Sequence, residues 1–449
     1  RHYPKAKVTA FLSTEVSQLR PLANEALQSL KSTTNIQELN PDNSSLMRDA
    51  HYDLCIDGLL GMQFNPPLRG TILQVIQKIN ENPNIRFRAA MDIPSGVADE
   101  PVDIAFRADF TYAAGIPKTP LFQECNHPWV GRIRYIDIGF FEEPAAAPFE
   151  RPPYLLTRSI LSPLQKLRSP HTHKKDYGHL CVVAGSGNMP GAACMAIKAA
   201  IRSGVGLVTA LVPASLLHSF ASSLPEVMWH PMPETNSGGL SWAGLSALRS
   251  TLEKASGVLI GPGLGTDPET RKLINWLCQN SPVPMVLDAD ALYPESIEAL
   301  KKRETDTPAF LTPHPGEWRR ILGAVNPNCG NQASPTDESL MSFAAEIRGH
   351  LLLKGPISRV TDGSTIYYST HGGPVLARGG SGDILAGILG GLVAQSGQPN
   401  RQTLATALVW QGAAADLWAG QQGQIAVKTT QILDYLSPAL RKTLLEPTT

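Results

Sequence analysis

Short, uninterrupted apolar runs alternate along this chain with longer stretches whose apolar residues recur every three or four positions. The first pattern predicts buried strands and the second predicts helices. Strands that alternate with helices form parallel sheets with right-handed crossovers, so the pattern predicts an α/β fold. The predicted strands are residues 8–12, 52–57, 88–91, 110–113, 133–138, 180–184, 207–212, 257–260, 284–287, 309–311 and 351–355, with a hairpin over 360–369.

The helical spacing is equally regular. It predicts helices over residues 18–30, 71–80, 192–203, 384–394, 403–420 and 430–445, and residues 35–43 are polar and predict a loop. A further helix should follow the glycine-rich stretch 261–265, because Thr266 and Glu269 have the spacing of a capping box.

Residues 140–170 are rich in proline and glutamate, and few core-forming patterns occur there. Such composition is typical of a linker between domains. We therefore assign residues 1–145 to a first domain, 146–170 to a linker and 171–449 to a second domain.

The composition narrows the possible functions. Lys+Arg and Asp+Glu both number 39 in the 449 residues, so no net charge favours nucleic acid or acidic membranes. The longest apolar run, 384–394, is shorter than the roughly 18 residues that a membrane span needs. The six cysteines include no CxxC pair and indicate reduced thiols of a cytoplasmic protein. The chain starts at Arg1 without Met or a signal-like segment, as expected of a fragment.

A glycine-rich turn opens the predicted helix at 384–394. Gly379, Gly380, Ser381 and Gly382 precede it directly, and backbone N–H groups at a helix start have no intrahelical acceptor. Together with the helix dipole they favour a phosphate, or the charge on a phosphoryl group in transfer. Asp383, in the first turn, could accept a proton from an attacking hydroxyl. The alternative is a tight turn with an aspartate that only complements the helix dipole.

Other predicted strands of the second half also end in small or polar residues. Glycine loops lie at 185–191 and 261–265, an Asp-Ala-Asp sequence starts at 288, His314 stands between two prolines, and Lys354 ends a strand. Ligands of parallel sheets bind at the carboxyl ends of strands, so these residues predict one cleft for a nucleotide and a substrate. The 185–191 loop fits neither the dinucleotide fingerprint nor a P-loop.

These motifs together resemble the bifunctional NAD(P)H-hydrate repair enzymes. The second half is similar to their ADP-dependent dehydratase, which has a ribokinase-like fold, through residues 173–178, 187–193, 261–265, 287–292, 311–317, 353–355 and 380–383. Residues 1–142 resemble their Rossmann-like epimerase through 57–61, 67–70 and 92–96. The resemblance implies two three-layer α/β domains. The family carries an Asn- and Gly-rich segment upstream of the first residues seen here, so we expect the epimerase half of this sequence to be incomplete.

The resemblance implies repair of hydrated NADH or NADPH. The S form would be dehydrated with ADP, or ATP, as phosphoryl donor, giving AMP and phosphate from ADP, and the R and S forms would be interconverted by the epimerase half. Asp383 would be the catalytic base. Ala193, Gly263 and His314 would contact the substrate with Asp383, while the nucleotide would contact Lys354, Gly355, Pro356, Ile357, Ser358, Gly380, Ser381 and Gly382.

A magnesium ion would bridge the nucleotide phosphates. In the first half, Asp57 and Ser95 match the family's potassium ligands, and Gly61 and Asp92 match its substrate contacts. These four residues end strands, where ordinary turn residues also occur. We expect the epimerase half of this polypeptide to be inactive. The resemblance also implies a homotetramer, and we expect no nucleic-acid or membrane partner.

Two other functions fit parts of the same pattern. A small-molecule kinase of the ribokinase superfamily, acting on a vitamin precursor or a sugar hydroxyl, would use the same glycine turn and aspartate. A nucleotide-sensing or assembly protein without activity would also bind a nucleotide, but it would not need the full set of site residues.

Overall fold

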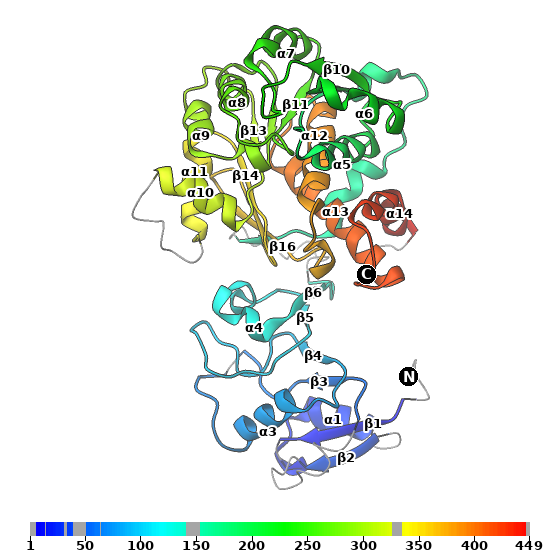
Figure 1. Cartoon of the computed structure of the whole chain (residues 1–449). Helices are drawn as coiled ribbons and strands as arrows, with labels where there is room; N and C mark the ends of the chain where they lie inside the picture. Colours follow the sequence, from blue (N-terminus) through cyan, green and yellow to red (C-terminus); the bar gives the residue numbers. More distant parts are fainter. Residues whose placement is uncertain are drawn as a thin grey trace. The chain divides into compact units, whose positions relative to one another are not determined.

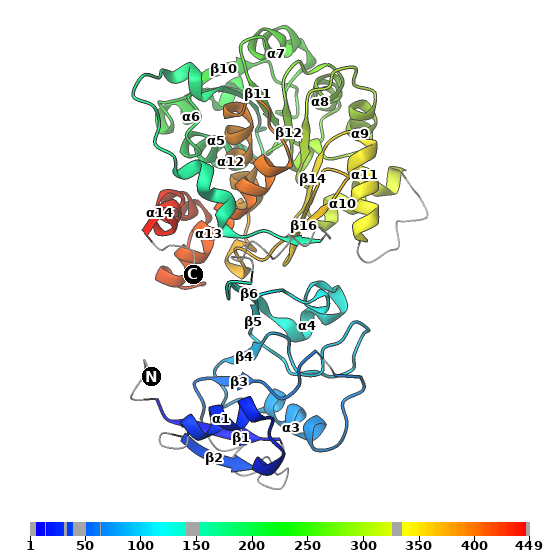
Figure 2. The same cartoon turned by 180° about the vertical axis from the view of Figure 1, so that it is seen from behind.

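The structure is a computed structural model that describes residues 6–13, 15–30, 34–38, 51–62, 64–140, 153–325 and 335–445. Its internal contacts divide the chain into two units, Arg1–Phe149 and Glu150–Thr449 (Figures 1 and 2). Both units have the α/β architecture that the alternating pattern predicts.

The first unit holds two parallel sheets. One contains β1 (Val8–Leu12) and β2 (Thr34–Glu38), and the other has the strand order β3-β4-β5-β6. The strands of the second sheet are β3 (Cys55–Asp57), β4 (Arg88–Met91), β5 (Phe110–Ala114) and β6 (Arg132–Ile136). Its helices are α1 (Pro21–Leu30), α3 (Gly70–Glu81) and α4 (His127–Val130). Helix α3 buries Val75 and Ile76.

Two predictions for this unit were wrong. Residues 34–38 lie in β2 and pair with β1 along its length, so a polar sequence is held as a strand by its neighbour. Residues 39–43 of the predicted loop are outside the described ones. Helix α1 begins at Pro21 rather than residue 18. Proline is favoured in the first helical turn and disfavours helical backbone in the residue before it.

The second unit is built on one ten-stranded sheet with the order β10-β9-β8-β11-β12-β13-β14-β15-β16-β7. Its neighbours are parallel except for β14–β15 and β15–β16, which form the predicted hairpin region. The strands are β7 (Tyr154–Leu155), β8 (His179–Val183), β9 (Leu207–Pro213), β10 (Met228–Met232), β11 (Gly257–Ile260), β12 (Met285–Leu287), β13 (Ala309–Leu311), β14 (His350–Leu353), β15 (Ser358–Thr361) and β16 (Ile366–Ser369).

Helices cover both faces of this sheet. They are α5 (Pro190–Arg202), α6 (Leu217–Ser223), α7 (Leu245–Leu252), α8 (Pro268–Asn280), α9 (Pro294–Lys301), α10 (Pro315–Val325), α11 (Asp337–Glu346), α12 (Ser381–Gln395), α13 (Arg401–Gln422) and α14 (Ile432–Leu445). Alternate residues of β8 enter different cores: Leu180 and Val182 pack with α5, α12 and α13, whereas Cys181 and Val183 pack with α7, α8 and α9. The unit therefore has three layers (Figures 1 and 2).

Helix α12 lies inside this architecture, and residues 384–394 are all buried. Glycine permits the close packing of α12 on α5, because a Cβ at Gly387 would stand 2.1 Å from the carbonyl oxygen of Ala196. The helix that begins at the glycine turn is thus fixed by the core beneath it. Its position does not depend on the surface loops.

Strand β10 and helices α6, α7, α9, α10 and α11 of this unit were not predicted from the sequence, and two further features depart from the expectation. Within the expected linker, β7 pairs with β16, and Leu161 is fully buried in the core, so this stretch contributes to folding. The N-cap of α8 is Asp267, whose side chain accepts from the N–H of Glu269, and not Thr266. The Glu269 side chain instead accepts from Ser241 and Trp242.

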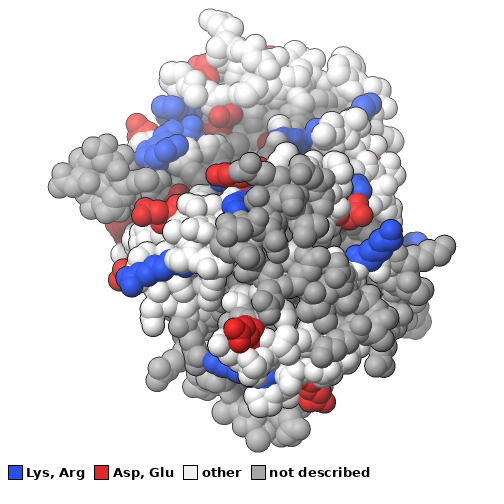
Figure 3. Space-filling view, turned by 90° about the horizontal axis from the view of Figure 1, so that it is seen from below, with Lys and Arg blue, Asp and Glu red and all other residues white. Residues whose placement is uncertain are grey.

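On the face drawn in Figure 3, Lys and Arg are interspersed with Asp and Glu among the described residues. This distribution agrees with the equal numbers of the two charges. Among the helices of the described residues, none combines the length and apolar character needed to cross a membrane.

The contact between α12 and α5 can be tested with two alanine substitutions. Gly387→Ala should lower the free energy of unfolding by about 2–3 kcal/mol, because the added methyl overlaps a backbone carbonyl. Gly420→Ala in α13 is the control: nothing stands within 4 Å of its Cβ position, so the change should stabilise by up to about 1 kcal/mol. Denaturant unfolding measures both. Equal effects of the two variants would contradict the packing.

Candidate functional site

The carboxyl ends of the central strands of the second unit meet through their loops. The N–H of Gly185, after β8, donates to the carbonyl of Pro262 after β11 at 2.8 Å. The N–H of Lys354, after β14, donates to the carbonyl of Pro313 after β13 at 2.9 Å. The loops predicted to share one edge of the sheet are therefore in direct contact.

An ion pair lies at the centre of this edge. Lys354 Nζ donates to Asp288 Oδ1 at 2.8 Å, and Glu317 Oε2 lies 3.8 Å from Nζ. The Thr312 hydroxyl donates to the same Asp288 oxygen at 2.7 Å. Burial alone would lower the pKa of Lys354, but the charges of Asp288 and Glu317 outweigh it and raise the pKa. Lys354 is therefore a permanent cation at this edge.

The glycine turn lies directly beside this cation. Gly380 is the N-cap of α12 and has left-handed backbone, with φ of 90°. A Cβ at Gly382 would stand 3.3 Å from Lys354 Nζ and 3.8 Å from Asp288 Oδ2. The N–H of Ser381 donates to the carbonyl of Arg378 at 3.3 Å, so this amide is partly engaged. Gly380, Ser381 and Gly382 thus lie next to a positive side chain, as an anion site requires.

Asp383 follows in the first turn of α12. The pKa of Asp383 is raised from the ordinary 3.8 to about 6: burial is the largest cause, the charges of Asp288 and Asp290 also raise it, and Lys354 lowers it. A carboxylate with a pKa near 6 is a stronger proton acceptor than an exposed one, yet it is still ionised at pH 7. The environment suits Asp383 to general-base chemistry.

His314 lies on the same edge, at the start of α10. Its Nδ1 faces the N–H groups of Gly316 and Glu317 at 2.9 and 3.2 Å, so Nδ1 is an acceptor and the ring proton is on Nε2. Burial and then the charge of Lys354 lower its pKa. His314 is therefore neutral at pH 7, and its Nε2 lies 3.4 Å from Glu317 Oε1.

The remaining predicted residues of this unit occupy two loops. Ala193 is buried in α5, close to Gly185. Gly263 has a positive φ of 67°, and a Cβ there would meet the carbonyl of Met189 at 2.5 Å, so both features require glycine. Residues 354–358, which include Gly355, Pro356, Ile357 and Ser358, connect β14 to β15. The Ser358 hydroxyl closes that turn by donating to the Gly355 carbonyl at 3.3 Å.

In the first unit, Asp57 and Ser95 form one buried pair. The N–H and the hydroxyl of Ser95 donate to the two Asp57 oxygens at 2.6 and 2.7 Å, and the N–H of Leu59 donates at 3.2 Å. The two residues are 3% and 1% exposed. Burial raises the pKa of Asp57, and the hydrogen bonds from Ser95 and Leu59 oppose this rise. The Asp57 carboxylate is therefore buried and accepts hydrogen bonds from the neutral donors of Ser95 and Leu59.

The other two predicted residues of this unit are more open. Asp92 has a positive φ of 68° and forms an ion pair of 2.5 Å with Lys118. No atom lies within 4 Å of a Cβ placed on Gly61. The structure therefore does not bring Gly61 into a packed contact, whereas Asp92 is fixed by its cationic partner.

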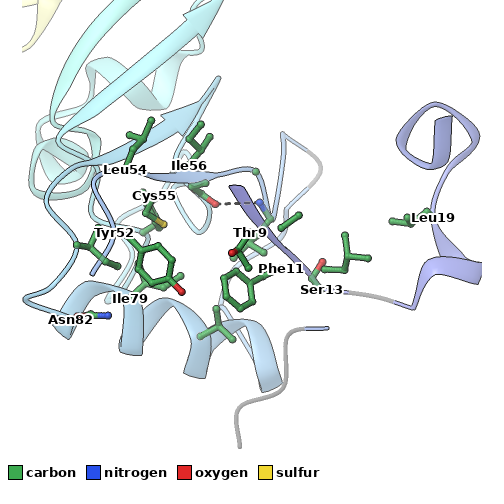
Figure 4. A pocket seen from close by; sticks show the side chains of 18 residues that line it. Thr9, Phe11, Ser13, Leu19, Tyr52, Leu54, Cys55, Ile56, Ile79 and Asn82 are labelled. Atoms are coloured by element: carbon green, nitrogen blue, oxygen red, sulfur yellow. Dashed lines mark hydrogen bonds between the residues drawn. The ribbon is translucent and has the colours of Figure 1, made fainter. Parts of the chain in front are cut away.

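A cavity of about 420 Å³ lies between β1 and β3. Figure 4 shows Thr9 and Phe11 of β1 on one side of it, and Tyr52 and Cys55 on the other. Asp57, at the end of β3, is part of its lining. The volume is in the range of small-molecule sites, so the Asp57 carboxylate borders a space that can hold a ligand.

The sequence did not reveal the partners of Lys354. Asp288 and Glu317 stand in motifs noted there, but no role followed for them, because neither spacing nor periodicity shows which cation they face. One feature of the sequence could have indicated this contact: Asp288 and Thr312 each come directly after a buried strand.

Comparison with known proteins finds matches to both units of the chain. The family model described as NAD(P)H-hydrate dehydratase matches residues 180–438, and that of the YjeF-related protein N-terminus matches residues 2–120. The bifunctional NAD(P)H-hydrate repair enzyme Nnr of Moorella thermoacetica is 34% identical over 401 residues, which cover 87% of this chain and 73% of the relative.

The chain belongs to the bifunctional NAD(P)H-hydrate repair enzyme family.

The repair enzyme of Coxiella burnetii is 31% identical over 438 residues, covering 96% of this chain and 84% of that one. Two solved structures resemble the second unit. A hypothetical protein of Streptococcus mutans has a TM-score of 0.54 and 26% identity, covering 64% of this chain and 99% of that chain. The ADP/ATP-dependent NAD(P)H-hydrate dehydratase of Bacillus subtilis, co-crystallised with ATP/Mg²⁺, has a TM-score of 0.50 and 27% identity, covering 62% and 93%. Membership of this repair family and the ribokinase-like fold are thus confirmed.

The environment of Asp383 predicts that replacing this residue with Asn stabilises the folded protein, and that the gain depends on pH. The raised pKa means that the folded protein binds a proton at Asp383 more tightly than the unfolded chain does, so ionisation destabilises the fold as pH rises from 3.8 to about 6. Asp383→Asn should raise the midpoint of thermal unfolding at pH 8 by about 1–3 °C. Below pH 4 the difference should vanish. Scanning calorimetry at both pH values measures it, and a destabilised variant at pH 8 would contradict the assigned environment.

Proposed function

We propose that the second unit dehydrates the S form of hydrated NADH or NADPH, with ADP or ATP as phosphoryl donor. With ADP the products would be NADH or NADPH, AMP and phosphate. The observation that carries this proposal is the position of Asp383: a carboxylate with a pKa of about 6 stands next to a glycine turn at a helix start and a buried lysine. Family membership supports dehydration over phosphorylation of a vitamin precursor or sugar.

The chemistry explains why a kinase-like fold would remove water. Hydroxide is a poor leaving group and phosphate is a good one, so phosphorylating the ring hydroxyl prepares its elimination. Asp383 would accept the hydroxyl proton as the oxygen attacks the terminal phosphoryl group of the nucleotide. The free N–H groups of the 380–382 turn and the Lys354 ammonium would stabilise the charge on that phosphoryl group.

The other predicted residues would then hold the two ligands. Ala193, Gly263 and His314 would contact the hydrated dinucleotide, and the 354–358 turn would contact the nucleotide. His314, neutral with its proton on Nε2, would donate to an oxygen of the substrate without adding charge. Lys354 would remain oriented by Asp288, so its position would change little on binding.

Magnesium fits this site as a nucleotide-bound ion. In the described part of the chain, no cluster of three or more His, Cys, Asp or Glu side chains forms a metal cage. Two carboxylates of the site, Asp288 and Glu317, already face Lys354. Phosphate and water oxygens would therefore supply most of its ligands, and the ion would neutralise phosphate charge.

For the first unit we propose interconversion of the R and S forms of the hydrated cofactor. Asp57 and Ser95 would hold a potassium ion, and Gly61 and Asp92 would contact the substrate. The buried Asp57 carboxylate beside a cavity supports this proposal. The expected inactivity of this half in the present polypeptide, a cytoplasmic location and a homotetrameric assembly remain predictions.

The dehydratase proposal can be tested by absorbance of reduced nicotinamide. Hydrated NADH incubated with ADP and Mg²⁺ should yield NADH, and Asp383→Asn should lower kcat by at least about 10³-fold, since a general base is removed from a phosphoryl-transfer site. Nucleotide affinity should change little, because the glycine turn and Lys354 remain. Near-normal turnover by Asp383→Asn would show that another group takes the proton.

The pH profile gives a second test of the same carboxylate. Activity requires ionised Asp383, so kcat/KM should rise with pH through a midpoint near 6 and level off above it. Lys354→Gln removes the charge that lowers this pKa, and the midpoint should move to higher pH. An unchanged midpoint in Lys354→Gln would show that the charge of Lys354 does not influence the pKa of Asp383.

Potassium binding is testable on stability alone. Replacing Na⁺ with K⁺ should raise the unfolding midpoint of the first unit, because a ligand that binds only the folded state stabilises it. Asp57→Asn should abolish the difference between the ions by removing the buried charge. The second unit supplies the control, as its midpoint should be insensitive to the ion. An equal response of wild type and Asp57→Asn would rule out the site.

A further inference from the structure

The loop that follows β8 holds one buried hydroxyl without a partner. Ser186 is 4% exposed, and its Oγ forms no hydrogen bond to any of the described residues. A buried polar group left unpaired destabilises a fold by about 1–3 kcal/mol. Such groups are rare in folded proteins, and those that occur need an explanation. The fold itself gains nothing from the hydroxyl at this position.

The backbone of the loop is held in place on both sides of Ser186. The N–H groups on either side of Ser186 are both engaged: that of Gly185 donates to Pro262, and that of Gly187 donates to Gly238 at 2.9 Å. The carbonyl of Ser186 accepts from Met189 at 3.1 Å. The direction of the Cα–Cβ bond of Ser186 is therefore held by the loop.

The hydroxyl faces the second glycine loop of the site. A Cβ on Gly265 would lie 3.8 Å from Ser186 Oγ and 4.0 Å from the terminal methyl of Met189. The N–H of Gly265 donates to Asp290 Oδ2 at 2.9 Å, which holds the glycine in place. The side of Gly265 that faces Ser186 carries no side chain. Between Ser186, Met189 and Gly265 there is thus room for one atom of the size of a methyl group.

This space belongs to the substrate side of the edge. Gly263 and Ala193, the proposed substrate contacts, lie on the same two elements, and the 354–358 turn proposed for the nucleotide follows a different strand. The Ser186 hydroxyl could donate a hydrogen bond to a ligand oxygen at this position. None of the described residues accepts a hydrogen bond from it.

We propose that Ser186 donates a hydrogen bond to an oxygen of the hydrated dinucleotide and thereby contributes to substrate affinity. The inference rests on the proposed dehydratase function. It assigns Ser186 to substrate binding only, because the Asp383 carboxylate, the glycine turn and Lys354 supply the groups that the chemical step needs. The hydroxyl would be retained for the ligand and not for the fold.

Steady-state kinetics with hydrated NADH and ADP test whether Ser186 contributes to substrate binding alone. Ser186→Ala should raise KM for hydrated NADH by about three- to tenfold, as loss of one hydrogen bond does, with kcat and KM for ADP unchanged. Ser237→Ala is the matched control. Its hydroxyl lies on the neighbouring loop but is exposed and bonded to Asp267, so KM should stay at the wild-type value.

Stability separates a binding role from a structural one. Without ligand, Ser186→Ala should unfold at the wild-type temperature or higher, because an unpaired buried hydroxyl is removed. A lower unfolding temperature, or an unchanged KM for hydrated NADH, would overturn the inference. Failure of the wild-type protein to convert hydrated NADH with ADP or ATP would instead overturn the proposed function, which keeps the two failures distinct.

Discussion

The ion pair between Lys354 and Asp288 joins the ends of β14 and β12 across β13, and Thr312 joins β13 to the same carboxylate. Three neighbouring strand ends are therefore tied together beneath the first turn of α12. Breaking such a buried pair from one side leaves an uncompensated charge, so each partner holds the other in place. The position of the cation beside Gly382, and with it the environment of Asp383, depends on this pair.

The second constraint comes from the core. Helix α12 is buried along most of its length and packs closely on α5 through Gly387, so its N-terminus is held from below. A rigid helix start and a fixed lysine together form a site whose charges are arranged before any ligand binds. Preorganised charge of this kind is the main contribution of a protein to phosphoryl transfer, because no reorganisation is needed as the charge moves.

Much of this arrangement follows from local sequence patterns. Buried apolar runs located nearly every central strand, and the rule that parallel strands end at one edge brought Asp383, Lys354 and His314 together. Strand β2 was not predicted, because its sequence is polar and its strand conformation depends on pairing with β1, a contact that the local sequence does not show. The partner of Lys354 and the unpaired state of Ser186 escaped for the same reason, since contacts between loops leave no periodic signal. Buried Leu161 shows that a proline-rich stretch can still supply a core residue.

The central claim is that the hydroxyl of the nicotinamide ring is phosphorylated while Asp383 accepts its proton. The hydroxyl oxygen then leaves as part of phosphate. The most direct measurement follows the oxygen atom of that hydroxyl. Hydrated NADH prepared in ¹⁸O water carries the label on the ring, and turnover with unlabelled ADP in ordinary water would release it. The account predicts that mass spectrometry finds one labelled oxygen in the inorganic phosphate. Label recovered in water, with unlabelled phosphate, would contradict it.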